Sequence, residues 1–189
     1  MPEHVLTVLD EAYFEYVDSE DYSDGIEESV KNGRRALVLR TFSKIYGLAG
    51  LRVGYGVGPS EVVEAIAKVR NAFDINQTAQ DAARASIGNR AEVTRRRRET
   101  AEERSRLEEA CTSLGLSVAS PPVANFVYVE TGEDSRAVFE RLLREGAIVR
   151  PLGSFGADDA IRVTVGTGEE NEFFAAALER VLQGAHTSF

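Results

Sequence analysis

Short apolar runs alternate with polar segments along the first ninety residues. The pattern predicts strands at residues 5–9, 36–42 and 52–57, a loop with a short helix closed by a glycine at 18–34, and helices at 62–69 and about 78–87. Polar residues follow the first two strands directly: Asp10-Glu11 after one and Ser43-Lys44 after the other. Strands and helices that alternate in this way are typical of an α/β domain.

A long, highly charged helical pattern covers residues 90–114 and ends at Gly115. Beyond it the pattern predicts strands at 116–119, 125–130, 147–152 and 161–165, a helix at about 134–144, and a last helix that starts with the capping-box sequence Thr167-Gly168-Glu169-Glu170. The chain is therefore predicted to have three parts: a first domain over 1–89, a connecting helix over 90–114 and a small α/β domain over 115–189.

Composition narrows the class of protein. With 189 residues, 43% of them hydrophobic, the chain has enough apolar mass for a globular core. No run reaches the length of a membrane span, and the first residues lack the pattern of a secretion signal, so we expect a cytoplasmic protein without a membrane partner. The single cysteine, Cys111, forms no intrachain disulfide or multi-cysteine metal site and is predicted to be buried and inert; we expect no metal.

The charge balance argues against nucleic acid as a partner. Asp plus Glu total 31 against 22 for Lys plus Arg, which gives a net charge of −9, opposite to the sign that phosphate binding requires. Only three of the basic residues are lysines, Lys31, Lys44 and Lys68, so the other nineteen are arginines. Together with the acidic excess, this skew suggests a halophilic source, a hypothesis that equal stability in low-salt buffer would contradict.

Three charged groups are predicted to meet at one edge of the first domain. Asp10 and Lys44 follow two strands, and active groups in α/β proteins gather at the carboxyl ends of strands. The connection from Lys44 to the next strand, residues 45–51, is too short for a parallel crossover, so that strand should be antiparallel and should bring Arg52 to the same edge. A carboxylate, an amine and a guanidinium suit a ligand with a basic nitrogen, a carbonyl and a phosphate.

These residues lie in segments that resemble a known family. The first-domain segments resemble the large-domain motifs of class II aminotransferases of fold type I, namely Asp10-Glu11-Ala12-Tyr13, Arg40-Thr41-Phe42-Ser43-Lys44 and the run from Gly47 to Tyr55. Asn125-Phe126, Ile148-Val149-Arg150 and residues 161–167 are similar to small-domain motifs of the histidinol-phosphate aminotransferase family. The resemblance implies the C-terminal part of a fold-type-I large domain, a mixed sheet with helices, followed by a small α/β domain.

The resemblance also implies a cofactor, pyridoxal 5'-phosphate, and a role for each site residue. Asp10 would pair with the pyridine nitrogen, which keeps the ring an electron sink, and Tyr13 would donate to the phenolic oxygen. Lys44 would form the Schiff base and then move a proton at the substrate's α-carbon. Ser43 and Arg52 would hold the cofactor phosphate. Asp10, Tyr13 and Lys44 would thus be the catalytic residues.

For the substrates, the resemblance implies contacts from the small domain. Arg162 would bind the α-carboxylate of the amino donor, Arg150 the phosphate of a phosphorylated substrate, and Asn125 would also contact the substrate. The implied reaction is amino transfer between glutamate and imidazole-acetol phosphate, giving 2-oxoglutarate and histidinol phosphate, in histidine biosynthesis. Family members are homodimers about twice this long, and no motif of their N-terminal half is found here, so an incomplete chain is expected.

Other interpretations remain open. A threonine-phosphate decarboxylase resembles the same family and uses the same lysine and aspartate, and a non-catalytic remnant would bind no cofactor. The glycines of residues 54–58 suggest a nucleotide-binding loop, but their spacing does not fit one. The run Arg95–Arg98 is interpreted as a solvated helix face with i,i+4 pairs rather than a polyanion site. His4 and His186 are not expected to be catalytic.

Overall fold

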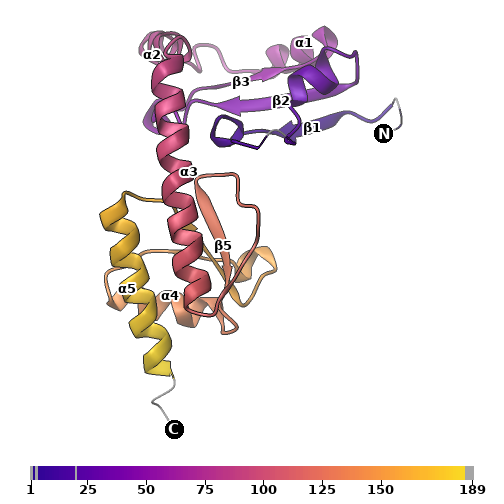
Figure 1. Ribbon diagram of the computed structural model, residues 1–189. Coiled ribbons are helices and arrows are strands. Elements are labelled where there is room, and N and C mark those ends of the chain that lie inside the picture. The colour runs from indigo at the N-terminus through magenta and orange to yellow at the C-terminus, as the bar shows by residue number, and fades with distance from the viewer. Residues whose placement is uncertain (1, 3, 20, 186–189) are drawn as a thin grey trace. The chain divides into compact units, whose positions relative to one another are not determined.

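The computed structural model describes residues 2, 4–19 and 21–185, and it divides into two compact units. Unit 1 comprises residues 1–97 and unit 2 residues 98–189. The helix α3 (Arg90–Ser113) runs from the first unit into the second, as Figure 1 shows, and it corresponds closely to the long charged helix that the sequence predicts. His186 lies outside the described residues. No helix in the described part of the chain has the length and apolar character needed to cross a membrane.

Unit 1 is built on a three-stranded sheet of order β1-β2-β3. The strands are β1 (Thr7–Asp10), β2 (Ala36–Thr41) and β3 (Gly54–Val57). β1 and β2 are parallel, and β2 and β3 are antiparallel, with Thr41 opposite Gly54. The prediction of an antiparallel third strand, made from the short connection after Lys44, is therefore confirmed, and the mixed sheet with it.

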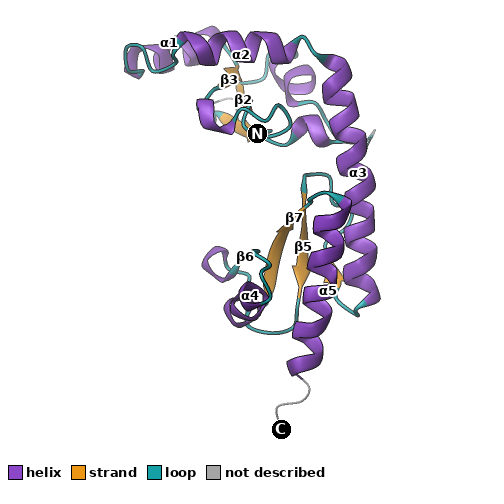
Figure 2. Ribbon diagram, turned by 90° about the vertical axis from the view of Figure 1, so that its left-hand side faces the viewer, coloured by secondary structure: helices purple, strands orange, loops and turns teal. Residues whose placement is uncertain are grey.

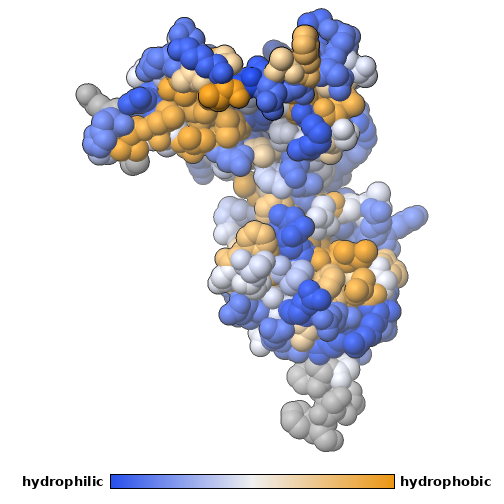
Figure 3. Space-filling view, turned by 180° about the vertical axis from the view of Figure 1, so that it is seen from behind, coloured by the Kyte–Doolittle hydropathy of each residue, from blue (hydrophilic) through white to orange (hydrophobic). Residues whose placement is uncertain are grey.

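The helical elements of unit 1 are short. They are the 3₁₀ turns η1 (Phe14–Tyr16) and η3 (Ala49–Leu51), the π-helical segment η2 (Ile26–Val30), and the helices α1 (Ser60–Val69) and α2 (Gln77–Ile87). The predicted short helix is η2, and Gly33 follows it with a φ of 70°. A cluster around Phe42, Val53, Ala79 and Ala83 is the core beneath the lysine loop. Figure 3 shows other apolar side chains gathered on the outer surface of this unit.

Unit 2 has a four-stranded antiparallel sheet of order β4-β5-β7-β6. Its elements are β4 (Ser117–Val118), β5 (Phe126–Glu130), α4 (Ser135–Arg144), β6 (Arg150–Pro151), η4 (Gly153–Phe155), β7 (Ala160–Thr164) and α5 (Gly168–Ala185). Figure 2 shows α3 and α5 beside one another along the sheet. Side chains from β5, β7, α3, α4 and α5 form one buried cluster. The predicted order of strands and helices is confirmed.

Several strands are shorter than predicted, and for two of them the physical reason is clear. The strand predicted over residues 147–152 is reduced to Arg150–Pro151, because it lies at the edge of the sheet and Pro151 has no N–H to donate. The third strand of unit 1 begins at Gly54 rather than at residue 52, because Arg52 adopts the left-handed conformation with φ 51° and ψ 49°. The capping box is present as predicted: Glu170 N donates to Thr167 Oγ1 at 3.3 Å, and Thr167 N donates to Glu170 Oε2 at 2.8 Å.

Candidate active site

Asp10 lies at the carboxyl end of β1, beside the end of β2. The parallel ladder continues one residue beyond it, where Glu11 N donates to Leu39 O at 2.9 Å. The Asp10 side chain is exposed, and its Oδ1 accepts a hydrogen bond from Ala12 N at 3.1 Å, which holds the carboxylate over the turn that follows the strand. The Asp10 carboxylate accepts no other hydrogen bond from the described residues, so it retains acceptor capacity for a ligand.

Lys44 lies in the bend after β2, within reach of the turn that carries Asp10. Its Nζ is 4.8 Å from the centroid of the Tyr13 ring, and the side chain is partly buried. This cation–π contact joins the segment after β1 to the segment after β2. The two motifs that the sequence analysis singled out are thus brought together by a direct contact between Lys44 and Tyr13.

Ser43 and Arg52 meet at the entrance to β3. Arg52 Nη1 lies 3.4 Å from Ser43 Oγ and donates to Ala49 O at 2.8 Å. The antiparallel pairing of β2 with β3 brings them together, as predicted. Arg52 is exposed and has a left-handed backbone, which is uncommon for a residue with a side chain and often accompanies function. A hydroxyl and a guanidinium side by side are suited to bind an oxyanion.

A buried ion cluster lies next to these groups and was not foreseen from the sequence. Arg40 Nε and Nη2 donate to Glu11 Oε2 at 3.0 and 2.8 Å, and Nη2 also contacts Asp24 Oδ1 at 2.8 Å. The guanidinium carbon is 3.7 Å from the centroid of the Phe14 ring, and Glu11 Oε1 accepts from Gly25 N. Because Glu11 follows Asp10 and Arg40 precedes Lys44 by four residues, the pair fixes β1 against β2 at the site. Glu11 and Arg40 both belong to the segments that resemble family motifs, but their spacing in the sequence does not predict that they form a pair.

The helix α3 also contacts the site loops. Arg96 Nη1 donates to Ile45 O at 2.8 Å, and Arg97 Nε donates to Glu15 O at 2.6 Å. The interpretation of residues 95–98 as a solvated helix face is therefore wrong for Arg96 and Arg97, which are partly buried. It holds for the exposed Arg95 and Arg98. The predicted pair between Arg98 and Glu102 is present at 3.8 Å, whereas Arg106 pairs with Glu103 at 2.7 Å.

A buried carboxyl, Glu15, and a partly buried phenol, Tyr46, lie close to the lysine loop. Burial raises the pKa of the Glu15 carboxyl, and its Oε2 has no hydrogen-bond partner among the described residues. Burial, together with the nearby Glu15 and Tyr55, raises the pKa of Tyr46 to about 12. The Tyr46 phenol is consequently neutral throughout the physiological pH range.

The residues predicted to bind substrate belong to unit 2. Arg150 and Arg162 are opposite one another on β6 and β7, so their side chains share one face of the sheet. The Arg162 guanidinium is 5.0 Å from the Phe126 ring, and its Nε is buried without a hydrogen-bond partner among the described residues. Asn125 precedes β5, and its carbonyl oxygen accepts from Val165 N at 2.9 Å. Two guanidinium groups at a cross-strand position repel one another, and an anion between them relieves that repulsion.

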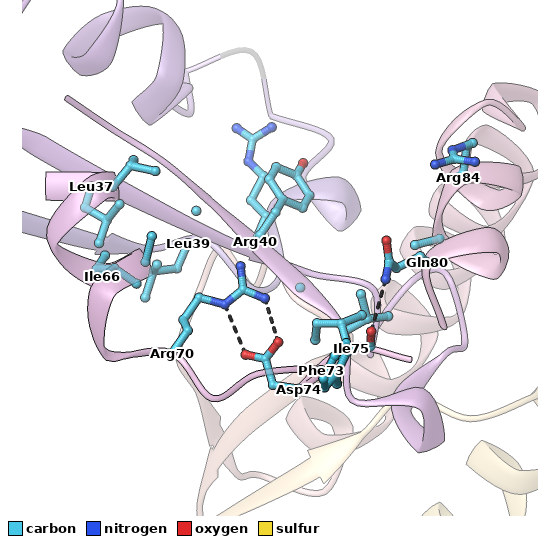
Figure 4. Close-up of a pocket in the computed structure, with 17 residues that line it drawn as sticks. Leu37, Leu39, Arg40, Ile66, Arg70, Phe73, Asp74, Ile75, Gln80 and Arg84 are labelled. Carbon is cyan, nitrogen blue, oxygen red and sulfur yellow. Dashed lines mark hydrogen bonds and ion pairs between the residues drawn. The ribbon is translucent and has the colours of Figure 1, made fainter. Parts of the chain in front are cut away.

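A groove in the described part of unit 1 is separate from these residues. It is a groove of about 920 Å³ that follows β3 and is bordered by α1, α2 and the segment between them. Figure 4 shows Leu37, Leu39 and Ile66 at one end of it and Phe73 at the other. None of Asp10, Tyr13, Ser43, Lys44 and Arg52 lines the groove. The candidate active site therefore lies apart from this groove, at the carboxyl ends of β1 and β2.

Comparison with known proteins matches this chain to aminotransferases. A family model described as "Aminotransferase class I and II" matches residues 1–178. The chain is 46% identical over 183 residues to a histidinol-phosphate aminotransferase of Moorella thermoacetica, covering 96% of this chain and 47% of that protein. It is 47% identical over 176 residues to an aromatic amino acid aminotransferase of Nocardia farcinica, covering 92% of this chain and 48% of that protein.

A solved structure of an aminotransferase also matches this chain. The crystal structure of histidinol-phosphate aminotransferase from Sinorhizobium meliloti in complex with pyridoxal-5'-phosphate matches with a TM-score of 0.88 at 33% identity. The match covers 98% of this chain and 51% of that one. The chain thus spans about half the length of the relatives it matches.

Proposed function

Because the chain belongs to the class I and II aminotransferase family, we propose that it forms the cofactor-lysine and small-domain half of an enzyme that transfers amino groups. The cofactor of this family is pyridoxal 5'-phosphate. Within this half we propose residues 1–89 as the remainder of the cofactor-binding domain, 90–114 as a connecting helix and 115–189 as the small domain. We further propose that the full-length form is a cytoplasmic homodimer.

The donor set at the sheet edge fits this cofactor. Asp10 offers a carboxylate for a protonated ring nitrogen, Tyr13 a phenol for the ring oxygen and Lys44 an amine for the aldehyde. Ser43 and Arg52, 3.4 Å apart, offer a hydroxyl and a guanidinium for the phosphate. The observation that carries the assignment is the contact of Lys44 Nζ with the Tyr13 ring, since it joins the two motifs at the carboxyl ends of neighbouring parallel strands.

Each residue at the candidate site is proposed to have its own role in amino transfer. When bound, the cofactor supplies an electron sink for a carbanion at the substrate's α-carbon. Asp10 keeps the ring nitrogen protonated by its negative charge. Lys44 would serve as the base that takes the proton from the substrate's α-carbon and as the acid that gives it back. Arg52 and Ser43 would hold the phosphate of the cofactor and so fix its position.

The substrate class is inferred from unit 2. The opposed pair Arg150 and Arg162 suits two anionic substrates that bind in turn, with Arg162 for the α-carboxylate of glutamate or 2-oxoglutarate and Arg150 for the phosphate of the phosphorylated substrate. Asn125, at the start of β5, is proposed as a further polar contact. This arrangement favours histidinol phosphate with 2-oxoglutarate, in histidine biosynthesis, and the identity to the Moorella relative supports it. The similar identity to the Nocardia relative makes an aromatic amino acid the competing donor.

Cofactor binding is the first test. The purified chain is mixed with pyridoxal phosphate and reduced with borohydride, and the labelled residue is located by mass spectrometry. The chain has only three lysines, so few sites have to be distinguished. We expect the label on Lys44, with Lys68→Ala, a change on the exposed face of α1, as the matched control. A visible spectrum in Lys44→Ala equal to that of the parent would contradict the assignment. A parent chain that takes up no cofactor would instead support a non-catalytic remnant.

The second test separates the substrates. The chain, loaded with cofactor, is given histidinol phosphate, phenylalanine or threonine phosphate as donor, and glutamate formed from 2-oxoglutarate is measured. We expect the histidinol phosphate reaction, and we expect Arg150→Ala to weaken it at least tenfold while leaving any phenylalanine reaction unchanged, since only the former has a phosphate. Release of carbon dioxide from threonine phosphate without a keto acid would identify the decarboxylase.

A further inference from the structure

Two consecutive arginines of α3 contact the two loops that carry the candidate catalytic residues. Arg96 Nη1 donates to Ile45 O at 2.8 Å, in the turn that follows Lys44. Arg97 Nε donates to Glu15 O at 2.6 Å, in the 3₁₀ turn η1. Consecutive side chains of a helix point about 100° apart, so one helix can reach both loops at once.

The turn after Lys44 leaves room for the guanidinium of Arg96. Gly47 N donates to Lys44 O at 2.8 Å, which closes the turn. Gly47 has a φ of 73°, and a Cβ at this position would lie 3.2 Å from Arg96 Nη1, closer than side chains normally approach. The Ile45 side chain is only 2% exposed, so packing holds that side chain while Arg96 holds the Ile45 carbonyl.

Glu92 holds the Arg96 side chain in this position. Arg96 Nε donates to Glu92 Oε1 at 2.7 Å, so one guanidinium bridges the Glu92 carboxylate and the Ile45 carbonyl. Arg95 Nε donates to Glu92 Oε2 at 2.8 Å, which restrains the carboxylate in turn. Because these charge-assisted hydrogen bonds restrict its rotamers, Arg96 contacts the lysine turn from a fixed place on the helix.

Arg97 holds the turn that follows Tyr13 in a similar way. This turn is closed by Tyr16 N, which donates to Tyr13 O at 3.0 Å. Glu15 is only 6% exposed, so its carbonyl oxygen has little access to water and needs a partner within the protein. Arg97 supplies a partner, and a buried carbonyl without one would destabilise the turn.

We propose that Arg96 and Arg97 are positioning residues that set the placement of Lys44 against the Tyr13 ring. Lys44 Nζ lies 4.8 Å from the centroid of that ring, and a cation–π contact alone is too weak to hold a flexible lysine side chain. Attaching both loops to one helix fixes their backbones relative to one another, and a misplacement of about 1 Å can cost about a hundredfold in rate. This role rests on the proposed function, since Lys44 is the residue that would bind the cofactor.

The placement of Lys44 is measured by nuclear magnetic resonance of the whole chain without cofactor. Isotopically labelled lysine gives three side-chain signals, from Lys31, Lys44 and Lys68, and replacing each lysine by arginine assigns them. The Tyr13 ring should shift the signal of the Lys44 methylene next to Nζ upfield, and Tyr13→Leu should abolish this shift. A Lys44 signal at the same position in the parent and in Tyr13→Leu would overturn the proposal.

Arg96→Met and Arg97→Met each remove one contact while keeping a long side chain. Each should remove most of the upfield shift, at a temperature at which circular dichroism shows the variant to be folded. Arg98→Met is the matched control, because it removes the same charge from an exposed position on the same helix, and it should keep the shift. A full shift in both folded variants would mean that the two arginines only stabilise unit 1, and it would overturn the proposal, as would an equal loss in Arg98→Met.

A milder variant keeps the test decisive if Arg96→Met does not fold. Glu92→Gln leaves Arg96 in the chain but weakens the contact that holds its guanidinium. It should lose part of the Lys44 shift. An unchanged shift in Glu92→Gln would overturn the role of Arg96.

Cofactor labelling separates this proposal from the proposed function. The rate at which pyridoxal phosphate and borohydride label Lys44 should fall at least about tenfold in Arg96→Met and Arg97→Met, and should stay at the parent's value in Arg98→Met. Unchanged labelling in the first two variants would overturn their role toward the cofactor. A parent chain that takes up no cofactor would contradict the proposed function, whereas the lysine signals would still show whether the arginines place Lys44.

Discussion

The two units of the chain are stabilised in different ways. Unit 2 buries its apolar side chains in one continuous cluster that includes Leu107, Val127, Leu142 and Leu178. Unit 1 has a small core around Phe42 and, beside it, ion pairs and arginine contacts to backbone carbonyls. Some of its apolar residues on β1, β2 and α1 stay exposed, among them Val8, Leu39 and Ile66. The difference indicates that unit 2 depends mainly on a continuous apolar core, whereas unit 1 depends more on buried polar contacts.

This contrast gives the two units different sensitivities. A continuous apolar core responds to the loss of volume, whereas a buried charge network responds to the loss of one partner. The two responses can be measured separately, because five of the six tyrosines lie in residues 1–97, and there is no tryptophan. Near-ultraviolet circular dichroism therefore reports mainly on unit 1, and far-ultraviolet circular dichroism reports on both.

The largest effect is expected from Arg40→Met in unit 1. The Arg40 and Glu11 side chains are only 10% and 7% exposed, so the change leaves a buried carboxylate without its cation. Losses of this kind cost about 3–5 kcal/mol of unfolding free energy. We expect the tyrosine signal to melt at a much lower urea concentration, while most of the far-ultraviolet signal persists.

The control for Arg40→Met is the double variant Glu11→Leu/Arg40→Met. It removes both charges and so should be more stable than the single variant, because no unpaired charge remains buried. If the double variant is as unstable as the sum of two independent losses, the ion pair is not what stabilises this region, and the contrast between the units is weakened.

The next largest effect is expected from Leu178→Ala in unit 2. Leu178 is completely buried in α5, and such truncations cost about 2–5 kcal/mol through lost transfer energy and the cavity left behind. Urea unfolding followed by far-ultraviolet circular dichroism measures it, and the tyrosine signal should change little. Phe173→Ala, on the same helix but 49% exposed, is the matched control and should cost much less. Equal costs would mean that the cluster is not the source of stability.

The sequence predicted the elements that follow from local patterns. The antiparallel third strand followed from the seven-residue connection, and the start of α5 followed from the capping-box sequence; both are present. Strand order predicted that Asp10, Lys44 and Arg52 lie at one edge, and the structure shows Lys44 beside the Tyr13 ring and Arg52 beside Ser43. The approach of Lys44 to Asp10 stays a prediction. Their catalytic roles, and those of Asn125, Arg150 and Arg162, stay predictions. So does adaptation to high salt, which unfolding midpoints in low and molar potassium chloride would test.

The contacts that the sequence did not predict all depend on tertiary structure. Arg40 and Glu11 are 29 positions apart, and Arg97 reaches the carbonyl of Glu15 across 82 positions. No periodicity encodes such pairs. Arginines in a charged helical run have the same pattern whether they face solvent or a neighbouring loop, so the run at 95–98 was interpreted correctly for only two of its members. The short β6 likewise reflects its edge position, which the apolar pattern does not reveal.

A smaller effect is expected from Thr167→Ala at the start of α5. The change removes the Thr167 hydroxyl that accepts from Glu170 N, and loss of a helix cap typically costs about 1 kcal/mol. Thr167→Ser keeps the hydroxyl and is the matched control, expected to lie close to the parent. Urea midpoints followed by far-ultraviolet circular dichroism measure both. A loss as large as that of Leu178→Ala would show that unit 2 depends on polar contacts as strongly as unit 1 does.

The smallest effect is expected from acidification, and it should appear in unit 1. Hydrogen bonds from Arg95 and Arg96 lower the pKa of Glu92 from 4.5 to about 2. A carboxyl with a lowered folded pKa stabilises the fold above its unfolded pKa, and this contribution is lost as the pH falls from about 4.5 toward 2. Arg96 also holds Ile45 O, so the tyrosine signal should become less stable over that range. Glu92→Gln should flatten this dependence, whereas Glu64→Gln on the exposed face of α1 should not.

Glu15 gives the same pH titration an opposing component. Burial raises its pKa, so the folded state binds the proton more tightly than the unfolded state does, and acidification relieves the cost of a buried charge. Glu15→Gln removes that charge and should stabilise unit 1 near neutral pH, while making the loss of stability on acidification steeper, because only the Glu92 component remains. An unchanged pH profile in Glu15→Gln, together with a steeper one in Glu92→Gln, would contradict the pH dependence assigned to these two carboxyls. The stability of unit 1 would then not depend on them, and its contrast with the apolar core of unit 2 would be weakened.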